Sequence, residues 1–174
     1  MVSAGCYAQK EAMQSEGGAQ VAQAMVQPPQ VIPDNTSCGK CGMFPARYPQ
    51  WQRQIIFTDG SMVPFDGSKC MLVFLFDMAQ YDKSHTRNDV ATIWVKDFHS
   101  GSWIQAPDAL FVVGSDTMGP MGKELIPFSD HAQALAFQQE HGGSLVEYSG
   151  ISMETLKPLM GGVKMPMKMN GHGM

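Results

Sequence analysis

The chain has 174 residues, with 16 acidic against 12 basic side chains and a formal net charge of −4. Its length gives room for one domain with a buried core, and 44% hydrophobic residues argue against a disordered chain. The acidic balance argues against nucleic-acid binding, which needs a clustered positive face. The longest unbroken apolar run, 71–76, is far shorter than the ~20 residues that span a bilayer. The sequence therefore predicts no membrane-spanning helix.

The first 35 residues have the features of an anchor followed by a tether. Small residues run into Cys6 and resemble the end of a bacterial lipoprotein signal peptide. We therefore expect Cys6 to be lipidated, which would hold the protein on the extracytoplasmic face of the cell envelope; the alternative is an ordinary surface cysteine. The stretch that follows is rich in Gln, Ala, Gly and Pro without sustained periodicity, and it predicts a flexible tether.

A folded domain is predicted over 36–159. The apolar stretches 54–58 and 62–65 flank an Asp-Gly pair, which is typical of a type I′ hairpin. Asp66 or Ser68 is expected to cap a helix that runs to about Tyr81. Strands are then predicted over 89–97 and 110–113, the second after a short strand or turn at 103–106.

The second half of this domain repeats the order of the first. An apolar-Pro-Phe-capping residue segment occurs at 62–66 and returns at 125–129, where Ser129 is expected to cap a helix that ends at His141. A strand is predicted over 144–148. We therefore predict an α+β protein built from two related strand-strand-helix-strand units, 36–106 and 107–159.

Sulfur is the outlier of the composition, with 15 methionines and four cysteines. Cys38, Cys41 and Met43 bring two thiols and a thioether into six residues, with glycines that let the backbone fold tightly. Soft sulfur ligands select copper(I), zinc or an iron–sulfur cluster, and the thioether favours copper(I). The alternative is a structural or oxidised cysteine pair with Met43 in the core. Cys70, at the start of an apolar helix, is expected to be a buried, inert thiol.

Two further methionine groups lie where a core is not expected. Met118 and Met121 flank a Gly-Pro pair in a predicted turn, with glycines that leave room for an ion. The segment 160–174 is predicted to be a flexible tail that weakly captures copper(I), and its candidate donors are Met165, Met167, Met169 and His172. The alternatives are a gap-filling methionine in the turn and incidental methionines in the tail. Among the other histidines, His99 at a strand end is a candidate ligand.

Several segments, taken in order, resemble the NosL family, the nitrous-oxide-reductase accessory lipoproteins. The matching segments span roughly 38–151 and are Cys-x-x-Cys-Gly-Met (38–43), Asp-Gly (59–60), Trp-Val-Lys-Asp-Phe (94–98), Trp-Ile-Gln-Ala-Pro-Asp-Ala-Leu-Phe-Val-Val (103–113), Pro-Met-Gly-Lys-Glu-Leu-Ile-Pro-Phe (120–128) and His-Gly-Gly (141–143).

The resemblance implies a periplasmic copper(I) chaperone that takes copper from an upstream donor and supplies it to nitrous oxide reductase, an enzyme of denitrification, or to a related cuproprotein. Carried over by motif, the copper ligands are Cys41 and Met121. A third donor is expected, with Met43, Cys38 and His99 as candidates and Met43 first because it is near Cys41. The family fold of two strand-strand-helix-strand units agrees with the repeat.

Two other functions compete with the copper carrier. A thiol–disulfide redox protein would use Cys38 and Cys41. A structural zinc module would add two other donors to the same pair. The sequence contains no Gly-x-Ser-x-Gly elbow, phosphate loop or paired zinc-protease histidines, so we do not expect an enzyme.

Overall fold

The computed structural model describes residues 26–161 and has the predicted α+β class. Cys6 and most of the methionine-rich tail lie outside these residues. The strands are β1 (Arg53–Phe57), β2 (Met62–Phe65), β3 (Val90–Lys96), β4 (Trp103–Gln105), β5 (Leu110–Gly119), β6 (Gly122–Phe128) and β7 (Ser144–Glu147). The α-helices are α1 (Ser68–Phe76), α2 (Met78–Tyr81), α3 (His131–His141) and α4 (Met153–Met160). No helix among the described residues is long and apolar enough to cross a membrane.

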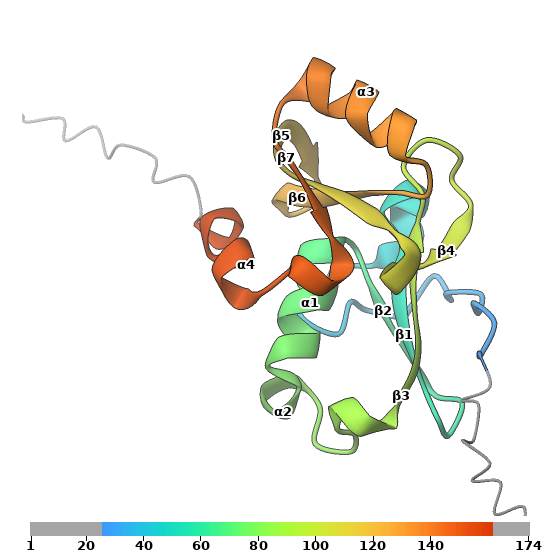
Figure 1. The fold of residues 1–174 in the computed structure, drawn as a ribbon. Helices are drawn as coiled ribbons and strands as arrows, with labels where there is room; N and C mark the ends of the chain where they lie inside the picture. The colour runs from blue at the N-terminus through green and yellow to red at the C-terminus, as the bar shows by residue number, and fades with distance from the viewer. Residues whose placement is uncertain (1–25, 162–174) are drawn as a thin grey trace, which may run out of the picture.

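Two antiparallel sheets organise these elements, with strand orders β2-β1-β3-β4 and β6-β5-β7 (Figure 1). In each sheet the strand that comes first in the sequence, β1 or β5, has a neighbour on both sides. One neighbour, β2 or β6, follows it directly, and the other, β3 or β7, follows after a helical segment. The order from β1 to β7 is the predicted one, and α4, which follows β7, was not predicted. That the two units are related to each other stays a prediction.

The main core lies between the first sheet and α1. Every residue of α1 except Phe76 is buried, which explains why its sequence is apolar on all sides rather than along one stripe. In Figure 1 the helix lies between α4 and the strands β1 and β2, and α1 also contacts β6. Phe111 and Leu125 of the second sheet join this core, so both sheets share it.

Three local predictions need correction. The hairpin at 58–61 is not type I′, because Gly60 has positive φ and no residue other than glycine does among those described. The helix that follows breaks at Asp77, and its N-cap is Gly67, so neither Asp66 nor Ser68 caps it. The helix predicted after the second Pro-Phe segment is α3. It is capped by Asp130, which accepts a hydrogen bond from Gln133 N, rather than by Ser129.

The Asp97 carboxylate joins the two sheets. It follows β3 and accepts four hydrogen bonds, from the backbone N and hydroxyl of Ser100 and from the same two groups of Ser129, which follows β6. Burial alone would raise the pKa of Asp97, but these four bonds outweigh burial and lower it. The ionised form is therefore the one that stabilises the junction.

We expect Asp97→Asn to lower the free energy of unfolding at pH 7 by about 2 kcal/mol, because bonds to a charged acceptor are stronger than those to an amide. The folded pKa lies below the unfolded value of about 3.9, so this stabilisation is present at neutral pH and is lost as the pH falls through the folded pKa. Urea unfolding at pH 7 and pH 3 should show a gap between the two proteins that narrows in acid. Asp108→Asn, at an exposed carboxylate, is the control; an equal loss there would contradict this role.

Candidate metal centre

Three cysteines and one aspartate meet where three segments of the chain converge. Cys38 and Cys41 lie in the loop before the first strand, Asp66 directly follows β2, and Cys70 is in the first turn of α1. One donor atom from each residue lies within 4.8 Å of the donor atoms of the other three. Four donors around one tetrahedral ion at bonds of about 2.3 Å are about 3.8 Å apart, so a contraction of at most about 1 Å would let these four enclose a metal.

The cysteine loop is folded by its own backbone and fastened to β2. Cys38 N donates to Met43 O at 2.6 Å, and Gly42, which has positive φ, donates to Cys38 O at 3.2 Å. Gly39 N donates to Pro64 O on β2, and Gly39 packs so closely on the side chain of Val63 that a Cβ would overlap it. The glycines therefore serve the tight loop expected from the sequence.

Buried polar contacts fix the turn of α1 that carries Cys70. Glu124 on β6 is almost fully buried, and its Oε2 accepts a hydrogen bond of 2.8 Å from the backbone N of Lys69. Lys69 Nζ donates to Met121 O at 2.7 Å and to Leu159 O at 3.3 Å. Lys69 thus links the Cys70 turn to the β5–β6 turn and to the end of α4.

Hydrogen bonds inside the cluster separate the pKa values of its thiols. A hydrogen bond with Cys70 is the largest influence on Cys38; with backbone contacts from the cysteine loop it outweighs burial and lowers the pKa of Cys38 to about 6. Burial raises the pKa of Cys41 to about 12. The pKa of Cys70 is also raised, by its hydrogen bond with Cys38 and by burial. Among the three thiols of the metal-free cluster, Cys38 is therefore the one that ionises most readily.

Asp66 adds a further sign that the cluster is made for a ligand. It is fully buried, and its Oδ1 accepts a hydrogen bond from Cys41 Sγ at 3.3 Å. Its other oxygen, Oδ2, is also buried and has no hydrogen-bond partner among the described residues. A buried acceptor without a partner costs free energy, and a bound cation would offset that cost.

Methionines line a cavity that Cys70 borders. The cavity has a volume of about 470 Å³, and Met118, Met121 and Met160 line it together with Cys70. Met121 lies in the turn between β5 and β6, as predicted, whereas Met118 lies in β5, where it pairs with Lys123; Met160 is the last residue of α4. We call this space the methionine cavity. Cys70 borders the methionine cavity and belongs to the thiol cluster, so it adjoins both the predicted thioethers and the other thiols.

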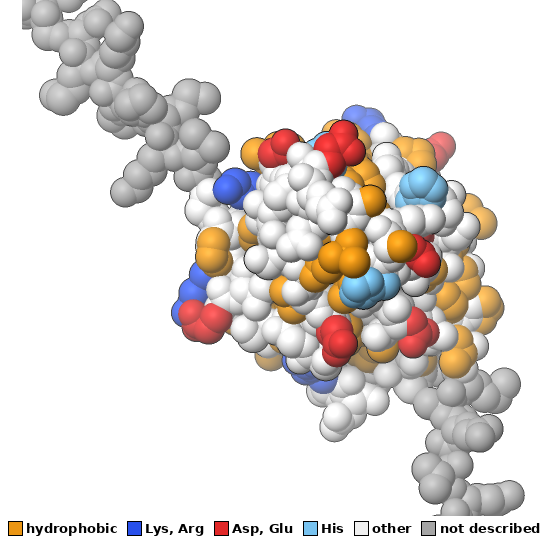
Figure 2. Space-filling view, turned by 45° about the horizontal axis from the view of Figure 1, so that its top comes forward, with side chains coloured by type: hydrophobic (Ala, Val, Ile, Leu, Met, Phe, Trp, Pro, Cys, Tyr) orange, Lys and Arg blue, Asp and Glu red, His pale blue; other side chains and the backbone are white. Residues whose placement is uncertain are grey.

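The other predicted ligands are placed differently. Met43 shares a shallow surface cavity with Cys41 and is half-buried. His99 is exposed after β3 and lines two cavities that contain no cysteine or methionine. On the face that carries α3, the histidine side chains form separate patches (Figure 2). The candidate donors Met165, Met167, Met169 and His172 lie outside the described residues.

Cys70 and Asp66 are the residues that the sequence analysis missed. Cys70 is buried as expected, and its place among the other thiols was not predicted. Cys70 was missed because it lies in an apolar helix, and the local sequence pattern does not show which loop packs against the start of that helix. Asp66 was interpreted as a helix cap for the same reason. The available signal was that both lie at the junction of a strand and a helix, where side chains can meet.

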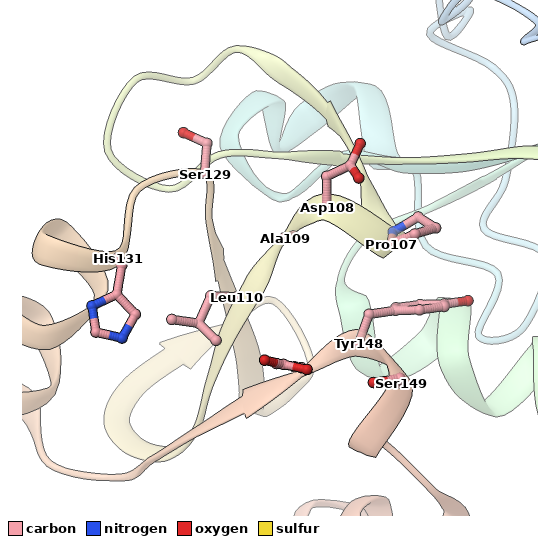
Figure 3. Close-up of a pocket in the computed structure, with 9 residues that line it drawn as sticks. Pro107, Asp108, Ala109, Leu110, Ser129, His131, Tyr148 and Ser149 are labelled. Carbon is pink, nitrogen blue, oxygen red and sulfur yellow. The ribbon is translucent and has the colours of Figure 1, made fainter.

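A cavity of similar size near the start of β5 has a different chemistry. Its volume is about 400 Å³, and Asp108, Ser129, His131, Glu147 and Tyr148 are among the residues that line it. Figure 3 shows oxygen and nitrogen atoms at its rim and no sulfur. It therefore lacks the donors that a soft metal ion selects.

Comparison with known proteins identifies the family. The sequence profile of the NosL family matches residues 29–156, which is most of the chain. The chain belongs to the NosL family. It is 31% identical over 144 residues to the copper-binding lipoprotein NosL of Achromobacter cycloclastes, and the match covers 76% of this chain and 70% of that protein.

A solved structure of the family has the same fold. The crystal structure of the copper chaperone NosL from Shewanella denitrificans matches with a TM-score of 0.63 and 27% sequence identity. The match covers 73% of this chain and 99% of that one. The resemblance found in the sequence is thereby confirmed.

The thiol cluster gives a direct prediction for the metal-free, reduced protein. We expect the ultraviolet absorbance of thiolate to rise by one group near pH 6, because Cys38 ionises there. Cys38→Ser should remove this step. Cys70→Ala should move it to a higher pH, because the largest stabilising hydrogen bond is lost. A first thiolate step in the wild type near the usual pKa of about 8.5 would contradict this arrangement.

Proposed function

We propose that this NosL-family protein is a copper(I)-binding chaperone of the cell envelope. The observation that carries the proposal is the cluster of Cys38, Cys41, Cys70 and Asp66, which places three soft donors around one point beside a methionine cavity. The relatives named above are a copper-binding lipoprotein and a copper chaperone. A binding role without catalysis agrees with both.

Copper(I) is the metal that suits the full set of sulfur donors. Thiolates and thioethers both bind it well, whereas zinc rarely accepts a thioether. Cys41 and Met121 remain the proposed ligands by family motif, and Cys70 is added because it adjoins the cysteine cluster and shares the cavity of Met121. Met43 and Cys38 complete the list of nearby sulfur donors. His99 stays a weaker prediction because it borders none of these sulfur atoms.

Transfer of copper would proceed by ligand exchange. The thioether of Met121 is neutral and the weaker donor, and it is 42% exposed, whereas Cys38 and Cys70 are buried. An incoming sulfur or imidazole group would therefore displace the thioether first and the thiolates afterwards. The acceptor we propose is nitrous oxide reductase or a related cuproprotein, supplied through an upstream donor. Lipidation at Cys6 would keep the exchange at the membrane surface.

A structural zinc site is the second candidate, and the same four residues favour it. Three thiolates and a carboxylate form a donor set that a tetrahedral zinc ion accepts. Such a site would be closed, whereas Cys70 here opens onto a cavity lined by methionines. A thiol-redox role keeps some support from the low pKa of Cys38. Measurements of metal binding and of disulfide turnover distinguish the copper carrier, the zinc site and the redox protein.

An anaerobic competition of the reduced protein against a chromogenic copper(I) chelator tests the proposal. We expect uptake of one copper(I) per chain. Cys41→Ser and Cys70→Ser should each lower the affinity by at least 100-fold, because a charged ligand is lost. Met121→Leu should lower it about tenfold, because it removes only a neutral donor and keeps the side chain's volume.

His131→Ala is the matched control, since His131 lines the sulfur-free cavity shown in Figure 3. It should leave the affinity unchanged. Stoichiometric zinc in the purified protein, with no competitive uptake of copper(I), would contradict the proposal and favour the zinc site. Disulfide turnover that is abolished by Cys38→Ser, without copper(I) uptake, would favour the redox protein.

A further inference from the structure

The methionine cavity is a basic site on an acidic protein. The chain carries a formal net charge of −4, yet the charged side chains that line this cavity are all lysines: Lys40, Lys69 and Lys123. No aspartate or glutamate is among the described residues that line it. Charge of one sign that gathers in a hollow attracts ligands of the opposite sign. The cavity therefore favours an anionic occupant.

Lys40 and Lys123 supply the charge that an occupant can reach. Lys69 is largely buried, its ammonium already donates to two backbone carbonyls, and its backbone N donates to the Glu124 carboxylate. Lys123 is exposed and Lys40 is half-buried, and neither forms an ion pair with any residue that the structure describes. Two lysines that line the cavity are thus available to carboxylates that arrive from outside.

The same cavity gathers exposed apolar surface. Six large hydrophobic side chains are exposed among the described residues, and three of these, Met118, Met121 and Met160, line it. Single exposed apolar side chains are common, but several around one hollow are typical of a binding surface. Methionine side chains are flexible and polarizable, so they adapt to the group that they contact. The occupant should therefore combine negative charge with an apolar side chain.

The volume of the cavity limits the occupant to a short segment. The volume of about 470 Å³ is in the range of pockets that hold small ligands. An α-helix with its side chains is about 10–12 Å across, so a whole helix would not enter, whereas one or two side chains would. A peptide segment with one anchoring side chain and flanking carboxylates fits both the volume and the charge.

We propose that the methionine cavity is the docking site for an acidic peptide segment of a partner protein, whose methionine enters the cavity while its carboxylates pair with Lys40 and Lys123. That this partner is the copper acceptor rests on the copper(I) function proposed above, whereas the docking does not. Because Cys70 borders the cavity, the partner's thioether would bind copper(I) there as the thioether of Met121 leaves. One neutral donor replaces another, so copper stays copper(I) and no proton moves.

Nuclear magnetic resonance of the metal-free, full-length protein, labelled at its methionine methyl groups, tests the docking. The probe is the acetylated and amidated peptide Glu-Asp-Met-Asp-Glu, and Gln-Asn-Met-Asn-Gln is its uncharged control. We expect the acidic peptide to shift the methyl signals of Met118, Met121 and Met160 and to bind about tenfold more tightly than the control. Added salt should remove this advantage, because it screens the lysines.

Charge reversal distinguishes the cavity from the rest of the surface. Lys40→Glu with Lys123→Glu should weaken binding of the acidic peptide about tenfold. The matched control, Lys83→Glu with Arg87→Glu, changes the net charge equally at two exposed residues outside the cavity and should leave binding nearly unchanged. Equal binding of the two peptides, equal losses in the two variants, or no shift of the cavity methyls would overturn the docking. Shifts that follow protein concentration alone would assign the cavity to a second copy of the chain instead.

Copper(I) loading then tests the exchange at the metal. A peptide with norleucine in place of methionine keeps the apolar volume and removes the sulfur. The methionine peptide should bind the copper(I)-loaded protein about tenfold more tightly than the norleucine peptide, and both should bind the metal-free protein equally. Equal binding in both states would overturn the exchange. If the protein takes up no copper(I), the exchange fails together with the proposed function, and the methyl shifts still decide the docking. If copper(I) binds and the acidic peptide does not dock, only the docking fails.

Discussion

The buried carboxylate of Glu124 is the contact on which the arrangement of the site depends. It holds the backbone of Lys69 at the start of α1, and the Lys69 ammonium in turn holds the backbone of Met121 and Leu159. One buried pair of residues thus sets the distance between a cysteine on α1, the β5–β6 turn and the end of α4. Burial raises the pKa of Glu124 to about 7. Leaving a buried hydrogen-bonding group without its partner costs about 1–3 kcal/mol, so the geometry is not easily lost. Gly67 has no room for a side chain, because a Cβ there would overlap the Glu124 carboxylate.

This constraint divides two kinds of sulfur chemistry between two environments. The thiols are mostly buried in one cluster, where hydrogen bonds and burial decide which of them is ionised. The thioethers are partly exposed and line an adjoining cavity that a ligand can enter. The copper(I) function proposed above would use this division, because the strong, charged donors are buried and the weak, neutral donors are accessible to an incoming ligand. Cys70 belongs to both groups.

Much of the fold follows from the sequence, because it depends on patterns that are local. The element order, the turn between Met118 and Met121 and the tight cysteine loop were all predicted from the spacing of apolar residues and glycines. The capping residues and the hairpin type were wrong, because neighbouring candidates such as Ser129 and Asp130 differ by too little free energy for sequence alone to rank them.

The centre itself was predicted in part. Cys38 and Cys41 were found because they are close in sequence. Cys70 and Asp66 were not recognised as members of the cluster, because they join it through packing of α1 and β2 against a distant loop. The family motif pointed to Cys41 and Met121 but gave no sign of a third thiol between their two environments. Long-range packing, rather than any local signal, therefore defines the donor set.

X-ray absorption at the copper edge of the one-to-one copper(I) complex tests the central claim most directly. The account predicts a first shell of sulfur alone, with both short thiolate and longer thioether distances, and a loss of short copper–sulfur scattering in Cys70→Ser. A shell that contains nitrogen, or one that is unchanged in Cys70→Ser, would contradict the placement of copper between the thiol cluster and the methionine cavity.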